Sequence, residues 1–191
     1  MKEKRDMSAK KGMVYVFTGE GKGKTSAGLG VAVRAVSNGM KVGWVSWYKE
    51  EKWPISEKKL SSRMISRGGG TMPVGNLKMY FMGEGFYKLP TDHATLREHK
   101  KAGSKALKKA EELIKKVEVL VLDEVNNAIK DKLVGLNEVI KLIEKRGKVH
   151  VILTGRNANK KIVELADLVT ECKKIKHPFD KGLKAVKGLD F

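Results

Sequence analysis

The stretch Gly19-Glu20-Gly21-Lys22-Gly23-Lys24-Thr25 decides the fold class of this chain. An apolar, strand-like segment (residues 13–18) precedes it, and a helix-like segment (residues 26–37) follows it. A glycine-rich turn between a strand and a helix lets successive backbone N–H groups point at phosphate oxygens. The stretch therefore predicts a phosphate-binding loop that holds a nucleoside triphosphate.

The residues of this loop have distinct expected roles. Lys24 can reach the polyphosphate, and the Thr25 hydroxyl can ligate Mg²⁺ or Mn²⁺. The usual spacing of such a loop requires a glycine where this chain has Thr18, so the loop is compact. We expect ATP to contact the whole loop and the residue after it, namely Gly19, Glu20, Gly21, Lys22, Gly23, Lys24, Thr25 and Ser26.

The composition favours one globular domain. The chain has 191 residues, of which 41% are hydrophobic and 32% charged, and this length buries a substantial core. Its apolar runs are strand-sized, well short of the ~20 residues that span a bilayer. Cys172 is the one cysteine, which excludes an internal disulfide and suits a reducing compartment. We therefore expect a cytoplasmic protein with no membrane partner.

The net charge of +18 has two interpretations. A strongly basic chain attracts polyanions such as nucleic acid. The lysines are instead spread over the whole sequence and alternate with glutamates on helical stretches, a pattern typical of a solvated surface. We favour the solvated surface and do not expect nucleic acid as a partner.

Strands and helices alternate along most of the chain. Residues 1–12 are charged and aperiodic, which predicts a flexible basic arm before a single P-loop domain over residues 13–191. The alternation predicts an α/β, RecA-like P-loop fold, a mostly parallel sheet of about six strands with helices on both faces. Strands are expected at 13–18, 41–48, 77–82, 119–122, 149–153 and 168–171, and helices at 26–37, 95–117, 136–145 and 160–166, with a short helix and a glycine-rich loop within 49–75.

Two polar motifs follow apolar strands of this predicted sheet. Asp123-Glu124 comes after Val119-Leu120-Val121-Leu122, and its carboxylates can bind Mg²⁺ beside the Thr25 hydroxyl. Thr154-Gly155-Arg156 ends the next apolar run, and Arg156 could contact ATP or form a surface ion pair. Ligands of such sheets bind at the carboxyl ends of the strands, so these motifs and the glycine loop are expected to share one crevice.

Two further segments narrow the function. They are Met82-Gly83-Glu84-Gly85-Phe86-Tyr87 and a tail that carries His177, Phe179-Asp180 and Gly182. With these, the chain resembles the P-loop type of ATP:cob(I)alamin adenosyltransferases, the corrinoid adenosyltransferases, from about Val14 to Phe191. The late first glycine is usual in that family. The other matching motifs are Leu120-Val121-Leu122-Asp123-Glu124, Thr154-Gly155-Arg156 and Glu164-Leu165-Ala166-Asp167.

The resemblance implies transfer of an adenosyl group rather than a phosphoryl group. Cob(I)alamin would attack the 5′ carbon of ATP, triphosphate would leave, and ATP would lie reversed relative to ordinary NTPases. Catalytic roles are then expected for Lys24, Thr25 and Phe86. The resemblance also implies a homodimer, and a basic surface suits a flavodoxin- or ferredoxin-like reductant.

The resemblance places the corrinoid on Phe86 and Tyr87. Phe86 matches the first of the aromatic residues that displace the axial ligand of cobalt, which makes Co(II) easier to reduce. Lys88 stands where the family often has the second, tryptophan, so Tyr87, Trp47 and Trp53 are the candidate replacements. The alternative for Phe86 is an ordinary core aromatic at the end of a strand.

Other functions remain open at this level. A RecA-like ATPase that binds nucleic acid would hydrolyse ATP in a DNA- or RNA-stimulated, salt-sensitive reaction. A P-loop kinase would release ADP, and a corrinoid or nucleotide carrier would have lost catalysis.

Overall fold

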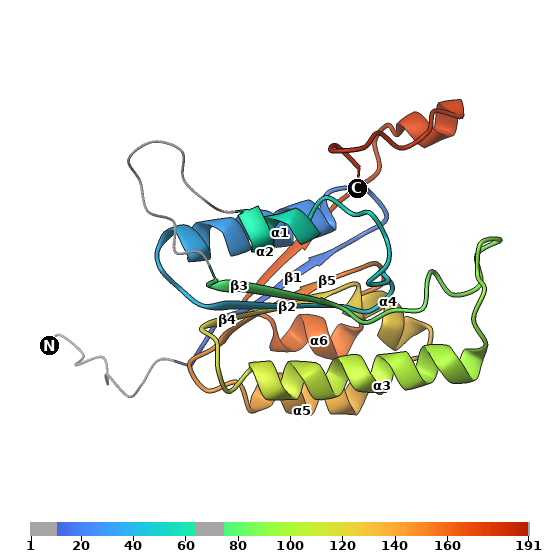
Figure 1. Ribbon diagram of the computed structural model, residues 1–191. Helices are drawn as coiled ribbons and strands as arrows, with labels where there is room; N and C mark the ends of the chain where they lie inside the picture. The colour runs from blue at the N-terminus through green and yellow to red at the C-terminus, as the bar shows by residue number, and fades with distance from the viewer. Residues whose placement is uncertain (1–10, 64–74, 191) are drawn as a thin grey trace, which may run out of the picture.

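The core of the protein is a six-stranded sheet in which every strand is parallel to its neighbours (Figure 1). This computed structural model describes residues 11–63 and 75–190. The strand order is β3-β2-β4-β5-β1-β6. The strands are β1 (Val14–Thr18), β2 (Val42–Ser46), β3 (Leu77–Phe81), β4 (Val119–Asp123), β5 (His150–Thr154) and β6 (Leu168–Glu171).

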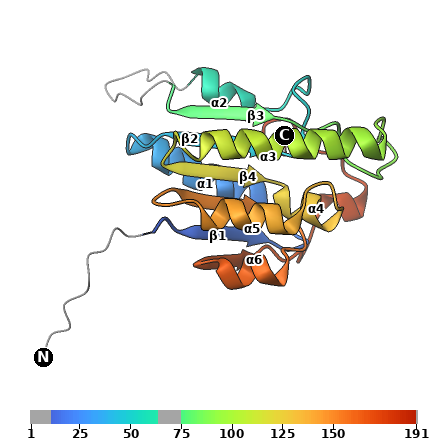
Figure 2. The same cartoon turned by 90° about the horizontal axis from the view of Figure 1, so that it is seen from below.

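Helices cover both faces of the sheet. Helices α1 and α2 lie on one face, and α3 to α6 lie on the other (Figure 1). Figure 2 shows α3, α5 and α6 in sequence across the second face, from the β2 side to the β1 side. The helices are α1 (Lys24–Ser37), α2 (Lys58–Arg63), α3 (Leu96–Leu113), α4 (Val125–Lys130), α5 (Leu136–Glu144) and α6 (Lys160–Leu165), followed by the 3₁₀ helix η1 (Pro178–Lys181).

This architecture confirms the predicted fold class. All six predicted strands and the four long predicted helices are present, and the short helix expected within residues 49–75 is α2. Helix α4 was not predicted, because its six residues include two asparagines and show no apolar period. Residues 1–10 of the predicted arm and Gly68-Gly69-Gly70 of the predicted loop lie outside the described residues.

The central strand of the sheet is buried from end to end. Every residue of β4 is buried, including Asp123 at its carboxyl end. A parallel strand covered by helices on both faces is apolar throughout, so the one charged residue stands out. Strands β2 and β5 flank β4, and β5 separates it from β1. The ends of β1, β2, β4 and β5 therefore meet along one edge, which is where the site forms.

The chain beyond β6 extends away from the sheet (Figure 1). Phe179 in η1 is 77% exposed. The His177 ring caps η1, because its Nδ1 accepts the Phe179 N–H at 3.1 Å. Asp190 returns to the glycine loop through an ion pair with Lys22. No helix within residues 11–63 and 75–190 has the length and apolar character needed to cross a membrane.

Candidate active site

The glycine loop joins β1 to α1 and lies against the end of β6. Gly19 has a φ of +100°, and a Cβ there would stand 2.5 Å from the Cys172 carbonyl oxygen. The Gly21 N–H donates to that same oxygen at 2.7 Å. Gly23, with a φ of +116°, precedes the first turn of α1. The glycines are thus required by close packing and by the left-handed backbone, and both requirements match the sequence prediction of a tight loop.

The Lys24 side chain folds back toward the glycines of the loop. Its side chain is buried, and its Nζ donates to the Gly21 carbonyl oxygen at 2.7 Å. Burial lowers the pKa of Lys24, since the ammonium gives up water, while the nearby Glu124 carboxylate opposes that shift. An anion bound in the loop would stabilise the charged ammonium and so offset the loss of water. Lys24 therefore has the place and the charge to bind a phosphate.

Asp123 receives hydrogen bonds from hydroxyl groups on three neighbouring elements. Its Oδ1 accepts from Thr25 Oγ1 at 2.9 Å and from Thr154 Oγ1 at 2.8 Å. Its Oδ2 accepts from Ser46 Oγ at 2.8 Å. The ammonium of Lys49 lies 3.4 Å from Oδ2. A fully buried carboxylate needs such partners, and they bring the ends of β2, β4 and β5 together at the start of α1.

Glu124 turns away from the sheet directly after Asp123. Its φ of +62° is left-handed, and its N–H donates to Thr154 Oγ1 at 2.9 Å. Burial raises the pKa of Glu124, and the Asp123 charge raises it further, while Lys24 and Lys49 oppose the shift. A site that raises the pKa of a carboxylate gains from added positive charge.

The donors at this edge fit a magnesium ion that is completed by a nucleotide. The Thr25 hydroxyl donates a hydrogen bond to Asp123, so the lone pairs of its oxygen remain free to bind a cation. Mg²⁺ in phosphate sites takes one or two carboxylates, with phosphates and water as the other ligands. No cluster of three or more His, Cys, Asp or Glu side chains suited to a metal occurs in the described part of the chain. Phosphate oxygens would have to supply the remaining ligands.

Arg156 faces the glycine loop from the end of β5. Its Nε lies 3.4 Å from Glu20 Oε2, and both side chains are more than half exposed. Its backbone N–H donates to Asn127 Oδ1 at 2.5 Å, which fixes the turn after β5 to α4. Arg156 thus forms the surface ion pair of the second sequence alternative, while its contact with ATP stays a prediction. Ser26 is exposed on the first turn of α1.

Thr18, where a glycine was expected, anchors the turn after β5. Its hydroxyl accepts the Ala158 N–H at 3.1 Å. A glycine would leave that N–H without this acceptor. The shortened loop is thus tied to β5 by a side chain at its first position.

Phe86 stands in an aromatic cluster near the end of β3. Its ring stacks on Tyr48, with centroids 5.8 Å apart, and lies 5.5 Å from the Trp53 ring. Phe86 is half-buried and packs against the hydrophobic core. Of the candidate replacements, Trp53 contacts Phe86, whereas Trp47 is buried. The second aromatic of this cluster thus comes from the segment between β2 and α2.

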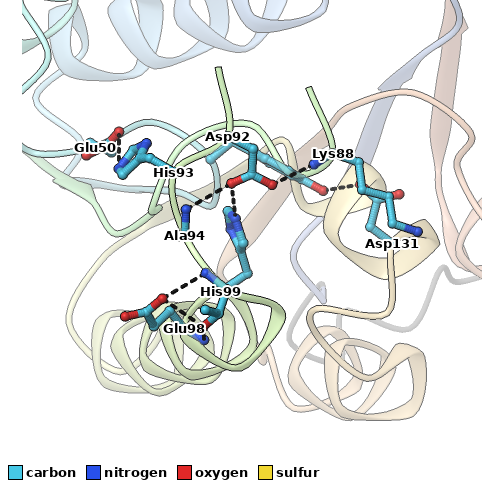
Figure 3. Close-up of polar contacts among 10 residues, drawn as sticks. Glu50, Lys88, Asp92, His93, Ala94, Glu98, His99 and Asp131 are labelled. Atoms are coloured by element: carbon cyan, nitrogen blue, oxygen red, sulfur yellow. Dashed lines mark hydrogen bonds and ion pairs between the residues drawn. The ribbon is translucent and has the colours of Figure 1, made fainter. Parts of the chain in front are cut away.

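Tyr87 and Lys88 point to a different neighbourhood. Tyr87 packs edge-on against His99 of α3, with centroids 5.2 Å apart, and the Lys88 ammonium lies 5.1 Å from the Tyr87 ring. Figure 3 shows Asp92 between Lys88 and His99. Its carboxylate accepts a hydrogen bond from the Lys88 N–H and bonds to the His99 ring. Phe86 and Tyr87 therefore have separate ring contacts, although they are consecutive in sequence.

Ser46 and Lys49 belong to the site, although the sequence analysis did not single them out. Both lie at the carboxyl end of β2, the strand that pairs with β4. Neither residue forms a motif by itself. The signal that could have found them is their place after an apolar strand adjacent to the one that ends in Asp123.

Comparison with known proteins gives consistent relatives. A protein named corrinoid adenosyltransferase from Sinorhizobium sp. is 38% identical over 95% of this chain and 81% of its own length. Corrinoid adenosyltransferases of Escherichia coli K12 and Salmonella typhimurium are 34% and 36% identical, each over 95% of this chain and 86% of their own length. A solved DNA replication initiation factor matches 86% of this chain and 40% of its own at 14% identity, with a TM-score of 0.42, too distant to bear on function.

The family comparison covers the site and nearly the whole sequence. Residues 10–191 match the model of the ATP:corrinoid adenosyltransferases BtuR/CobO/CobP. The match includes the glycine loop, the Asp123 hydroxyl cluster and the aromatic cluster around Phe86. By this match and the identities of its relatives, the chain belongs to the ATP:corrinoid adenosyltransferase family.

Proposed function

We propose that the glycine loop and the Phe86 cluster form the two halves of one adenosyl-transfer site. The loop would hold the triphosphate of ATP, and the cluster would lie under the corrin ring. The observation that carries this proposal is the hydrogen-bonded cluster of Thr25, Asp123 and Thr154 beside the buried Lys24. Family membership favours adenosyl transfer over the nucleic-acid-binding ATPase and the kinase.

In this reaction the protein would position the two substrates and stabilise the charge of the leaving triphosphate, and no acid–base catalysis is required. Co(I) supplies the electron pair that forms the cobalt–carbon bond, and the bond from C5′ to oxygen breaks. Inorganic triphosphate leaves with that bond's electrons. Lys24, Lys22 and the loop N–H groups would stabilise its growing charge. Holding cobalt in line with C5′ supplies the remaining advantage.

A divalent cation would be held at the start of α1. Thr25 and Glu124 are the proposed ligands, and Asp123 would act mainly by orienting the Thr25 hydroxyl. Bound Mg²⁺ or Mn²⁺ would neutralise charge on the leaving triphosphate. Arg156, which pairs with Glu20, would contact ATP once that ion pair opens.

The aromatic half would prepare the cobalt. An apolar wall of Phe86 and Trp53 offers no ligand to the lower face of a corrin, so a four-coordinate Co(II) would be favoured there. Such a cobalt is easier to reduce to Co(I). Tyr87, turned toward His99, would border the ring rather than face the metal.

Three broader assignments follow from the same proposal. A flavodoxin- or ferredoxin-like protein would supply the electron, since an acidic donor suits a chain with a net charge of +18. The family resemblance supports a homodimer. A reducing cytoplasm suits the lone Cys172.

Product analysis tests the function directly. The protein, Mg²⁺, ATP and chemically reduced cob(I)alamin should yield adenosylcobalamin and inorganic triphosphate in equal amounts. Lys24→Ala should lower kcat/KM by about a hundredfold or more, the loss typical when one donor to a developing charge is removed. Lys160→Ala, at an exposed position of α6, is the matched control and should keep wild-type turnover.

Other products would contradict the proposal. ADP and phosphate would indicate a kinase or an ATPase. Binding of ATP and corrinoid without product would indicate a carrier.

A further inference from the structure

Lys49 lies where the two proposed halves of the site meet. Its ammonium donates to Glu57 Oε1 at 2.8 Å and lies 3.4 Å from Asp123 Oδ2. Its side chain is 13% exposed, that of Glu57 12%, and that of Asp123 fully buried. One ammonium group therefore joins the carboxylate at the nucleotide half to a carboxylate of the segment before α2.

The main chain of Lys49 makes a third connection. Its carbonyl oxygen accepts the Gly83 N–H at 3.0 Å, and the carbonyl of Tyr48 accepts the Gly85 N–H at 3.1 Å. A Cβ on Gly83 would stand 2.2 Å from the Tyr48 carbonyl carbon, so the two segments pack backbone to backbone. These contacts fix the segment that carries Phe86 against the end of β2.

Glu57 belongs to the same short segment as Trp53. This segment folds back on itself, since the Trp53 N–H donates to the Glu50 carbonyl at 3.2 Å and the Ile55 N–H to the Trp53 carbonyl at 2.9 Å. Ile55 is buried and anchors the turn. The position of Glu57 thus constrains the position of the Trp53 ring, which lies 5.5 Å from Phe86.

Lys49 and Glu57 compensate one another where water has little access. The Lys49 ammonium lies between the Glu57 and Asp123 carboxylates, and the side chains of Lys49 and Glu57 are only 13% and 12% exposed. Glu57 Oε2 is buried without a hydrogen-bond partner among the described residues, so Glu57 depends on Lys49 for compensation. A buried carboxylate that loses its cation is destabilised and moves toward water.

We infer that Lys49 is a positioning residue that couples the nucleotide half of the site to its corrinoid half. The inference rests on the proposed function. The ammonium holds the segment of Trp53 against the Asp123 cluster, and the carbonyl holds the segment of Phe86. The two aromatic rings are therefore in register with the phosphate-binding loop.

Loss of the Lys49 ammonium should break the link between the two halves of the site but leave ATP binding in the nucleotide half intact. In a Lys49→Met variant, Asp123 keeps its hydroxyl donors from Thr25, Ser46 and Thr154. ATP binding should therefore persist. Glu57 would lose its partner, and the Trp53 segment would lose its link to the nucleotide half.

The test measures the two dissociation constants separately, without turnover. In Lys49→Met, the dissociation constant for ATP with Mg²⁺ should stay within about threefold of wild type. That for cob(II)alamin in the presence of ATP should rise about tenfold or more, since misplacement of a positioning group is costly. The four-coordinate Co(II) spectrum should be lost in parallel. Lys49→Arg should restore most of both, because the cation returns.

Two further variants secure the interpretation. Glu57→Met removes the acceptor at the other end of the bridge and should reproduce the Lys49→Met pattern, and it stands in for that variant if Lys49→Met does not fold. Lys160→Met, at a side chain 91% exposed on α6, should match wild type in both constants.

The outcomes are distinguishable. Unchanged constants in Lys49→Met, a selective loss of ATP binding, or an equal loss of both ligands would each overturn the role of Lys49. Wild-type protein that binds no corrinoid would refute the proposed function itself, and the role of Lys49 with it.

Discussion

At the scale of single residues, the site depends on how one buried carboxylate is satisfied. Asp123 accepts hydrogen bonds from the hydroxyl groups of Thr25, Ser46 and Thr154. Each bond fixes the direction of a hydroxyl, and for Thr25 it leaves the oxygen lone pairs free of that bond. A buried charge in such a network costs far more to disturb than an exposed one. Asp123 therefore explains why the loop has a defined geometry before any nucleotide arrives.

Phe86 gives the sharpest residue-level prediction. Phe86→Ala should impair adenosylation that starts from cob(II)alamin far more than adenosylation that starts from pre-reduced cob(I)alamin. The reason is that the apolar wall acts on reduction of the cobalt, not on attack at C5′. Parallel rate measurements from the two starting materials check this. Leu89→Ala, at an exposed position in the same loop, is the control. An equal loss from both materials would exclude the ligand-displacement role.

At the scale of elements, polar contacts fix the second half of the connection from β3 to α3. Thr95 and Glu98 form a capping box at the start of α3. Asp92 bonds to His99 at 2.8 Å and accepts the Lys88 N–H at 2.8 Å (Figure 3). These contacts hold the segment that carries Phe86 and Tyr87 to a long helix.

This connection should give the protein an acid-sensitive stability. The hydrogen bond from His99, with the Lys88 N–H, lowers the pKa of Asp92 to about 2. The unfolded chain titrates an aspartate near pKa ~3.9, so this group stabilises the fold above pH ~4, and that contribution is lost as pH falls toward 2. In Asp92→Asn, the free energy of unfolding should fall less steeply across that window.

Urea denaturation at a series of pH values measures this slope. Glu164→Gln, at an exposed position of α6 with a weak 3.9 Å ion pair, is the control and should keep the wild-type slope. The same slope in Asp92→Asn as in wild type would show that Asp92 does not contribute to it.

At the scale of the whole molecule, the net charge of +18 bears on partners rather than on the fold. Turnover that depends on a flavodoxin-like donor should fall as ionic strength rises from about 0.05 to 0.2 M, because the Debye length shortens to ~8 Å near the upper end. Turnover from pre-reduced cob(I)alamin should change much less over the same range. Coupled and uncoupled assays side by side measure the difference. Equal salt sensitivity in both would place the effect on substrate binding instead.

The sequence by itself determined the sheet and the polar motifs at the carboxyl ends of its strands. Each predicted strand was a local apolar run, and the glycine loop and Asp123-Glu124 were contiguous motifs at strand ends. Local patterns of this kind can be recognised in the sequence, because backbone geometry and burial act on neighbouring residues. Helix α4 was not predicted, since its six residues include two asparagines and show no hydrophobic period.

Only the tertiary structure decided how the aromatic cluster and the bridge are built. Trp53 and Phe86 come from different connections, and they meet because β2 pairs with β3. Lys49 joins Asp123 to Glu57 because β2 also pairs with β4. The pairing of strands is set by the packing of the entire sheet, so contacts between residues distant in sequence carry no local signature. The sequence therefore located the glycine loop, whereas the fold brought the aromatic residues together and joined the Trp53 segment to Asp123 through Lys49.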